Sequence, residues 1–263
     1  MFDYLAALEC VAAKQYPLRY DGAWAIDLRE IEAAVDERTR ALIVVNPNNP
    51  TGSFLKDDEL AWLAALCRNR GAVLISDEVF SDFGLTPDAH RISTLAGRSN
   101  VQAFSLSGLS KVVGLPQMKL GWIVVNGPAE FRQPCLDRLE LIADTYLPVA
   151  TPVALAAPYF LEAGLVVRDQ ILRRISGNLD CLRSTSCEVL SVEGGWSAIV
   201  RVPRVKSEEQ WCLELLGEDE VLVQPGYFFD FDTEAYLVVS LLTAPQDFIE
   251  GISRLASRVA RCN

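Results

Sequence analysis

The sequence predicts an α/β fold, with a mainly parallel sheet in a large first domain and a smaller α/β domain at the C-terminus. Short apolar runs rich in β-branched residues alternate with helical patterns, which is typical of βαβ units. The pattern changes after residue 128, where helices come first and short strands follow. The 263 residues and the 50% hydrophobic content are ample for a core.

The first half of the chain supplies the predicted large sheet. Residues 2–22 resemble a helix, a strand and a turn, and residues 27–39 an amphipathic helix. Residues 57–70 predict a helix, because acids open it and Gly71 follows its last basic turn. Four apolar runs predict buried strands, at 41–45, 72–76, 101–105 and 121–125.

The second half predicts the smaller domain. Its expected helices are 129–143, 151–163, about 165–185, 207–217 and 245–261. Its expected strands lie within 187–192, 196–202, 221–226 and 236–242. We place the boundary near residue 168, giving a large domain over 1–168 and a small C-terminal domain over 169–263.

Composition excludes several classes of function. The net charge of -11 argues against nucleic acid or an anionic membrane surface as a partner. No run of eighteen apolar residues predicts a membrane span, and the acidic N-terminus does not resemble a secretory signal. Seven dispersed cysteines without a CxxC pair indicate reduced thiols in the cytoplasm. The single histidine, His90, argues against a His-based triad and a multi-His metal site, so we predict no metal.

Three successive predicted strands end in polar residues. Asn49 follows the first, Asp77 the second, and Lys111 the third, in a loop of small residues that includes Ser107 and Ser110. The carboxyl ends of parallel strands meet at one edge of a sheet, so we expect these side chains to converge. Taken singly, they also fit a turn, a helix cap and a solvated lysine. Their shared order favours a site.

This set of groups suits pyridoxal phosphate (PLP). A lysine amine forms a Schiff base with the aldehyde of PLP. A buried carboxylate keeps the ring nitrogen protonated, so that the ring can act as an electron sink, and an amide can hold the ring hydroxyl. A dinucleotide-binding domain is disfavoured, because no GxGxxG follows a strand.

The motifs NPNNPTG, SDEVF and SGLSKVVGLPQMKLGW resemble the fold-type I PLP-dependent enzymes, specifically the class I/II aminotransferase family. The resemblance extends to GGW at 194–196 and QPGYFF at 224–229. It implies the large domain of the PLP transferases, Lys111 as the Schiff-base lysine, Asp77 as partner of the ring nitrogen, and Asn49 as donor to the ring hydroxyl. It also implies a cis bond before Pro50 and a homodimer.

Four positions depart from the family pattern. Phe80 stands where a tyrosine usually contacts the ring hydroxyl, and Lys119 where an arginine usually grips the phosphate. Gly108 replaces a phosphate-binding serine, for which Ser107 or Ser110 is a candidate substitute. Val238 stands where the family has an arginine for the substrate carboxylate. We place the cofactor site at Asn49, Asp77, Phe80, Ser110, Lys111 and Lys119.

The resemblance further implies an N-terminal portion, with a helix N-terminus for the phosphate, that has no counterpart before Met1. We therefore expect an incomplete large domain. The leading hypothesis is a PLP-dependent aminotransferase that moves an amino group from an amino acid or amine to a 2-oxo acid, both small molecules. The alternatives are a PLP lyase or decarboxylase on the same scaffold, and a truncated, non-catalytic remnant that binds PLP weakly.

Overall fold

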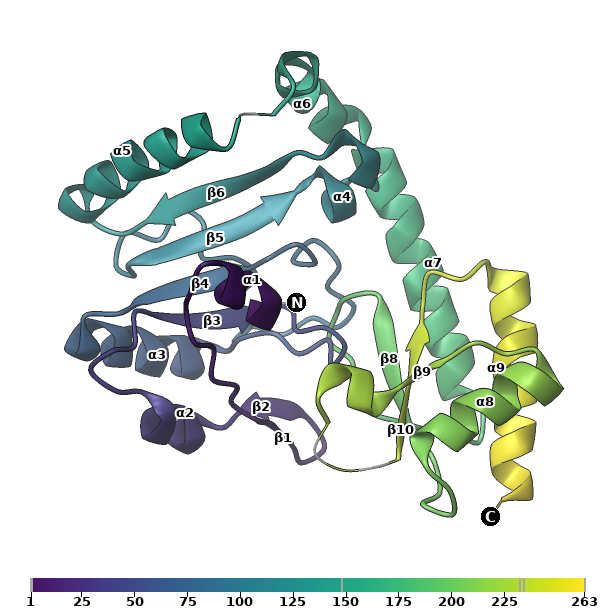
Figure 1. The fold of residues 1–263 in the computed structure, drawn as a ribbon. Coiled ribbons are helices and arrows are strands. Elements are labelled where there is room, and N and C mark those ends of the chain that lie inside the picture. Colours follow the sequence, from purple (N-terminus) through teal and green to yellow (C-terminus); the bar gives the residue numbers. More distant parts are fainter. Residues whose placement is uncertain (1, 148, 232, 234, 263) are drawn as a thin grey trace.

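The described residues form two four-stranded sheets with flanking helices and a separate β-hairpin, as the computed structural model shows (Figure 1). The structure describes residues 2–147, 149–231, 233 and 235–262. The first half contains α1 (Phe2–Leu8), β1 (Leu18–Tyr20), β2 (Trp24–Ile26), α2 (Leu28–Ala34), β3 (Ala41–Val45), α3 (Asp57–Arg70), β4 (Val73–Asp77), β5 (Ala103–Gly108), α4 (Leu109–Val112), the 3-10 turn η1 (Pro116–Met118) and β6 (Gly121–Asn126).

The second half is richer in helix. It contains α5 (Ala129–Thr145), α6 (Thr151–Ala163), α7 (Leu165–Arg183), β7 (Glu188–Val189), β8 (Ser197–Arg201), α8 (Glu208–Asp219), β9 (Gln224–Pro225), the 3-10 turn η2 (Gly226–Phe229), β10 (Tyr236–Ser240) and α9 (Pro245–Arg261). The α/β class is confirmed. The predicted boundary near residue 168 stays a prediction, and α7 runs through that position without a break.

The prediction of a mainly parallel sheet is wrong for the chain as a whole. In the first sheet, of order β3-β4-β5-β6, the pairs β3–β4 and β4–β5 are parallel, but β5–β6 is antiparallel. Residues 109–120 fold back on themselves as α4 and η1, so Gly108 pairs with Gly121 and no crossover helix intervenes. The second sheet, of order β7-β8-β10-β9, is antiparallel throughout.

Two strands of the small sheet are much shorter than predicted. The run 187–192 keeps only β7, because the chain then leaves the sheet and the Glu193 carbonyl accepts hydrogen bonds from Leu85 and Thr86 of the first half. The run 221–226 keeps only β9, because the Val221 N–H donates to the Leu215 carbonyl of α8 at 2.9 Å and Pro225 has no N–H to donate to the ladder. By contrast, α3 has the predicted bounds, and Gly71 ends it in the left-handed conformation at φ 65°.

The two sheets have separate buried clusters. Leu42, Val44 and Leu74 of the first sheet pack with Leu60 and Leu63 of α3. The second sheet packs against α7, α8 and α9, which lie on one side of it (Figure 1). By contrast, α5 and α6 contain no buried residue, and side chains such as Leu141 and Leu155 stay largely exposed. Among the described residues, no helix is long and apolar enough to cross a membrane.

Candidate functional site

The ends of three neighbouring strands lie in one row. Val45 at the end of β3 is the register partner of Asp77 at the end of β4, and Asp77 is the partner of Leu106 in β5. Backbone bonds of 2.8 Å continue the row, from Asn46 N–H to the Asp77 carbonyl and from Glu78 N–H to the Leu106 carbonyl. This register places the segments that carry Asn49, Asp77 and Lys111 at a single edge of the sheet, as expected from the sequence.

Asp77 is a half-buried carboxylate at the centre of this row. Its Oδ1 accepts a hydrogen bond from the Val79 N–H at 3.2 Å. Burial raises the pKa of Asp77 above its ordinary value, and the Val79 bond offsets only part of that rise. No cation contributes to the shift within the part of the chain that the structure describes. The carboxylate is therefore placed to gain from a cationic partner.

Lys111 lies on the short helix α4 and its amine faces aromatic rings. The Nζ is 5.4 Å from the centre of the Trp196 ring and 5.9 Å from the centre of the Phe80 ring. Phe80 and Trp196 contact each other edge to face, with centroids 5.3 Å apart. Phe83 completes the wall at 5.0 Å from Trp196. The faces of these rings attract a positively charged amine, and among the described residues Lys111 forms no ion pair with a carboxylate.

Asn49 is exposed and lies between the two halves of the chain. Its Oδ1 is 3.5 Å from the hydroxyl of Ser197 on β8, the donor of this long hydrogen bond. The peptide bond before Pro50 is cis, which confirms that expectation, and the bond before Pro47 is cis as well. No residue in the described ranges accepts a hydrogen bond from the Asn49 side-chain amide, which is left to bind another partner.

The predicted phosphate end of the site is the less enclosed end. Ser110 is half-buried on α4, whereas Lys119 is exposed and has a left-handed backbone with φ 51°. A side-chain carbon at Gly108 would lie 2.8 Å from the Leu120 carbonyl oxygen. The hairpin of β5 and β6 therefore leaves no room for the serine that is usual at this position in the family.

Val238 is part of a packed apolar cluster. It is 3% exposed on β10 and packs with Leu190, Ile199 and Tyr236 beneath Trp24 of β2. The sequence resemblance predicts an arginine for the substrate carboxylate at this position, and Val238 makes apolar contacts there.

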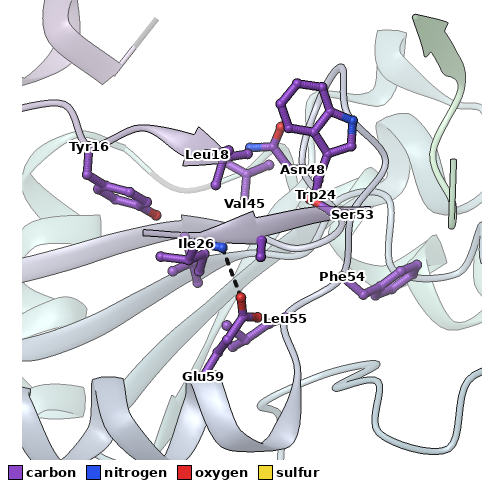
Figure 2. Close-up of a pocket in the computed structure, with 12 residues that line it drawn as sticks. Tyr16, Leu18, Trp24, Ile26, Val45, Asn48, Ser53, Phe54, Leu55 and Glu59 are labelled. Atoms are coloured by element: carbon purple, nitrogen blue, oxygen red, sulfur yellow. Dashed lines mark hydrogen bonds between the residues drawn. The ribbon is translucent and has the colours of Figure 1, made fainter. Parts of the chain in front are cut away.

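A small pocket lies beside the site but does not contain it. Its lining comes from β1, β2, β3, the loop 48–55 and α3, and includes Tyr16, Trp24, Asn48 and Glu59 (Figure 2). The Glu59 carboxylate accepts hydrogen bonds from Ile26 N–H and Lys56 N–H, both at 2.9 Å, and the Tyr16 hydroxyl donates to the Ile43 carbonyl at 2.9 Å. The Glu59 bonds join β2 and the loop to α3, and the Tyr16 bond joins the segment before β1 to β3. None of the predicted site residues lines the pocket.

The sequence assigns no role to Trp196 or Phe83, although Trp196 lies beside Lys111 and Phe83 packs on Trp196 in the structure. The motif GGW at 194–196 was visible as part of the resemblance, but nothing in the sequence showed that its tryptophan reaches the other sheet. The indole Nε1 of Trp196 is buried and makes no hydrogen bond with any described residue. A buried donor without a partner beside a lysine amine is consistent with a site that takes a ligand.

The residues present fit PLP at its reactive half. A primary amine, a carboxylate with a raised pKa and an amide match the aldehyde, the ring nitrogen and the ring hydroxyl of the cofactor in kind, and their segments lie at one sheet edge. The phosphate end has only Ser110 and Lys119 as candidate ligands.

Comparison with known proteins identifies the family of the chain. Residues 1–247 match the family model described as aminotransferase class I and II. An alanine aminotransferase of Mycobacterium bovis is 28% identical over 247 residues, which cover 89% of this chain and 57% of that protein. An S-alkyl-thiohydroximate lyase of Arabidopsis thaliana is 28% identical over 243 residues, covering 86% and 52%. The chain thus spans between half and three-fifths of the length of these relatives.

A solved structure shows the same fold. Alanine aminotransferase from Pyrococcus furiosus superposes with a TM-score of 0.85 at 20% identity, covering 99% of this chain and 67% of that one. At this identity the likeness describes the fold alone. The family resemblance noted in the sequence is confirmed.

Proposed function

Because the chain belongs to the class I and II aminotransferase family, we propose that its sheet-edge site binds PLP and serves amino-group transfer from an amino acid or amine to a 2-oxo acid. The observation that carries the proposal is the register of the strand ends. It brings the segments of Asn49, Asp77 and Lys111 to one edge of the sheet.

Lys111 is the residue that we propose to react. PLP, when bound, supplies an aldehyde for amines and a ring that withdraws electrons from the carbon bearing the amine. Lys111 Nζ is the amine that holds the cofactor before substrate arrives and accepts the α-proton of the substrate afterwards. Trp196 and Phe80 keep water from one side of this amine and limit its movement.

Asp77 and Asn49 orient the cofactor ring in this proposal. An ionised carboxylate in a half-buried place is costly, as the raised pKa of Asp77 indicates, and a protonated ring nitrogen offsets that cost. The Asn49 amide donates to the ring hydroxyl. Phe80 has no hydroxyl, so Asn49 is the one proposed donor to the ring hydroxyl, without the tyrosine that is usual in the family.

The phosphate has two proposed ligands, Ser110 and Lys119. Lys119 offers a single point charge where an arginine would make two hydrogen bonds, so we expect the phosphate to be held weakly. The relatives contain a further part that this chain does not span, and the activity of the chain itself is part of the proposal.

We also propose a homodimer. The exposed apolar side chains on α5 and α6 support further contacts, because large apolar patches are typical of association surfaces. Light scattering during size-exclusion chromatography would report the mass. A monomeric mass at high protein concentration would contradict the proposed homodimer.

A PLP lyase or decarboxylase is the second candidate. It is favoured by Val238, which is buried among apolar side chains and gives the substrate carboxylate no partner. One of the relatives is named as a lyase. A non-catalytic remnant that binds PLP weakly is the remaining alternative, and it would retain the Lys111 site without turnover.

An isotope-labelled amino donor separates these functions. The purified chain is incubated with PLP, the donor and a 2-oxo acid, with the Lys111→Arg variant as control. Labelled nitrogen in the new amino acid supports transfer, whereas labelled ammonia or released carbon dioxide supports the lyase or decarboxylase. If the chain shows no turnover above the Lys111→Arg control, the non-catalytic remnant is the remaining interpretation.

A further inference from the structure

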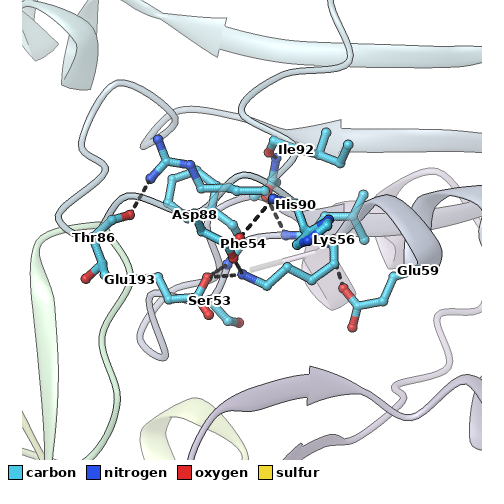
Figure 3. Close-up of polar contacts among 12 residues, drawn as sticks. Ser53, Phe54, Lys56, Glu59, Thr86, Asp88, His90, Ile92 and Glu193 are labelled. Atoms are coloured by element: carbon cyan, nitrogen blue, oxygen red, sulfur yellow. Dashed lines mark hydrogen bonds and ion pairs between the residues drawn. The ribbon is translucent and has the colours of Figure 1, made fainter.

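One turn of the second half is locked into the loops that form the site. The turn comprises residues 193–196, between β7 and β8, and contacts the loops 52–56 and 83–86 (Figure 3). The loops follow Asn49 and Phe80 closely along the chain. The turn ends at Trp196, beside Lys111.

An ion pair fixes the side chain of Glu193. Lys56 Nζ lies 2.7 Å from Glu193 Oε2 and 2.7 Å from Asp88 Oδ2, so one amine joins two carboxylates. The same Glu193 oxygen accepts the Phe54 N–H at 3.0 Å. The side chains of Lys56 and Glu193 are only 23% and 17% exposed, so solvent screens the pair less than a surface pair.

The amine of Lys56 is suited to this task. Burial alone would lower the pKa of Lys56, but the hydrogen bonds to Asp88 and Glu193 outweigh burial, and the pKa is raised. The amine is therefore charged at neutral pH. Asp88 belongs to the same half of the chain as Lys56, so of these two ion pairs only Lys56–Glu193 joins the two halves.

The backbone of the turn is bound as firmly as the side chain. The Glu193 carbonyl accepts the Leu85 N–H at 2.8 Å, and the Gly195 N–H donates to the Phe83 carbonyl at 2.9 Å. A side-chain carbon at Gly194 would lie 2.7 Å from that same Phe83 carbonyl. Glycine is needed there because the two segments touch backbone to backbone.

Trp196 depends on this anchorage. Its Nε1 makes no hydrogen bond with any residue in the described ranges, so ring contacts and the backbone alone fix the indole. The ring contacts are edge-to-face packing on Phe80 and Phe83, each worth about 1 kcal/mol. The Trp196 carbonyl also accepts the Leu241 N–H at 2.8 Å, so the turn that precedes Trp196 and this bond together set the orientation of the indole toward Lys111.

We propose that Glu193, held by Lys56, is a positioning residue that keeps Trp196 against the amine of Lys111. The proposal rests on the proposed function for its consequence in PLP binding, but its structural claim concerns the chain without cofactor. Loss of the link leaves the turn held by its backbone hydrogen bonds alone, and Trp196 then shifts relative to the Lys111 amine.

The test compares variants of the full chain by two readouts. Glu193→Gln and Lys56→Met break the link. Asp88→Asn is the matched control, because it removes a carboxylate at the same 2.7 Å from the same amine without touching the link. The first readout is the near-UV circular dichroism of the protein without PLP, with Trp196→Phe identifying the Trp196 band among the five tryptophans.

The second readout is the dissociation constant of PLP, followed by its absorbance on attachment to Lys111. We expect both linking variants to lose the Trp196 band and to weaken PLP binding on the order of tenfold, while Asp88→Asn keeps the band and the affinity. Lys56→Arg, which keeps the positive charge, should retain both the Trp196 band and the affinity for PLP. If Glu193→Gln does not fold, Lys56→Met and Lys56→Arg carry the comparison.

An unchanged Trp196 band in folded Glu193→Gln or Lys56→Met would overturn the proposal, and so would an equal effect of Asp88→Asn. The failure of the proposed function looks different: wild type would form no Lys111 adduct, while the band would still respond to the loss of the link. A changed band with unchanged PLP affinity would also overturn the positioning role.

Discussion

The amine of Lys111 lies 5.4 Å from the centre of the Trp196 ring, so a residue of α4, beside the first sheet, and a residue beside the second sheet lie close together. Lys111 follows β5, and Trp196 directly precedes β8. The site is thus built by both halves of the chain, and its geometry depends on the contacts that hold the halves together.

Asp77→Asn should stabilise the chain without PLP and weaken PLP binding. The pKa of Asp77 is raised in the folded state, so its favourable contribution is present below the unfolded pKa of about 3.9 and is lost as pH rises through the folded pKa. At pH 7 the asparagine avoids the cost of a half-buried charge. Urea unfolding at pH 7 and near pH 3 should show a gain in stability at pH 7 only. Equal stability of both proteins at pH 7 would contradict the raised pKa.

Asp88→Asn should change the stability at pH 7 in the opposite direction to Asp77→Asn. The hydrogen bond from Lys56 lowers the pKa of Asp88, so its contribution is present above the unfolded pKa of about 3.9 and is lost as pH falls through the folded pKa. The variant should therefore be less stable than wild type at pH 7 and approach it in acid. A variant that is as stable as wild type at pH 7 would show that the Lys56–Asp88 pair contributes nothing.

Val238→Arg should not restore a substrate clamp. The side chain is 3% exposed, so arginine would place an unpaired charge in an apolar cluster and lower the free energy of unfolding by about 3–5 kcal/mol. Val205→Arg is the control, since Val205 is 63% exposed and the change should stay within about 0.5 kcal/mol. Chemical denaturation compares the two. A stable Val238→Arg that gains transaminase activity would mean that the position opens toward the substrate.

Gly108→Ala should weaken the hairpin that leads into the lysine helix. The new carbon would meet the Leu120 carbonyl oxygen at 2.8 Å, and such overpacking costs about 1–3 kcal/mol. Gly177→Ala is the matched control, because nothing lies within 4 Å of the new carbon and a helical alanine is stabilising by about 1 kcal/mol. Thermal unfolding of the two variants should differ in sign. Equal melting temperatures would contradict the close approach of the strands.

The local parts of this fold were predictable from the sequence. The bounds of α3 follow from its charged ends and from Gly71, and β3 matches its apolar run because nothing interrupts it. The polar residues after β3, β4 and β5 indicated the sheet edge, because parallel neighbours share an end. These features depend on residues that are close in sequence.

The parts that were mispredicted depend on distant contacts. The direction of β6 is set by the fold of residues 109–120, and the apolar pattern of its residues is the same for either direction. The shortness of β7 follows from hydrogen bonds between Glu193 and residues 85–86. Trp196 was missed for the same reason, since its neighbours Phe80 and Lys111 lie far from it in the sequence.

The most direct test of the account is to locate the lysine that reacts with PLP. The chain has five lysines, Lys14, Lys56, Lys111, Lys119 and Lys206, so borohydride reduction of the PLP-treated protein followed by peptide mass spectrometry identifies the modified one. We expect the label at Lys111 in wild type and its loss in Lys111→Arg, with the other four lysines unlabelled at low PLP. A label spread over the lysines, or retained in Lys111→Arg, would contradict the assignment of Lys111 as the cofactor lysine.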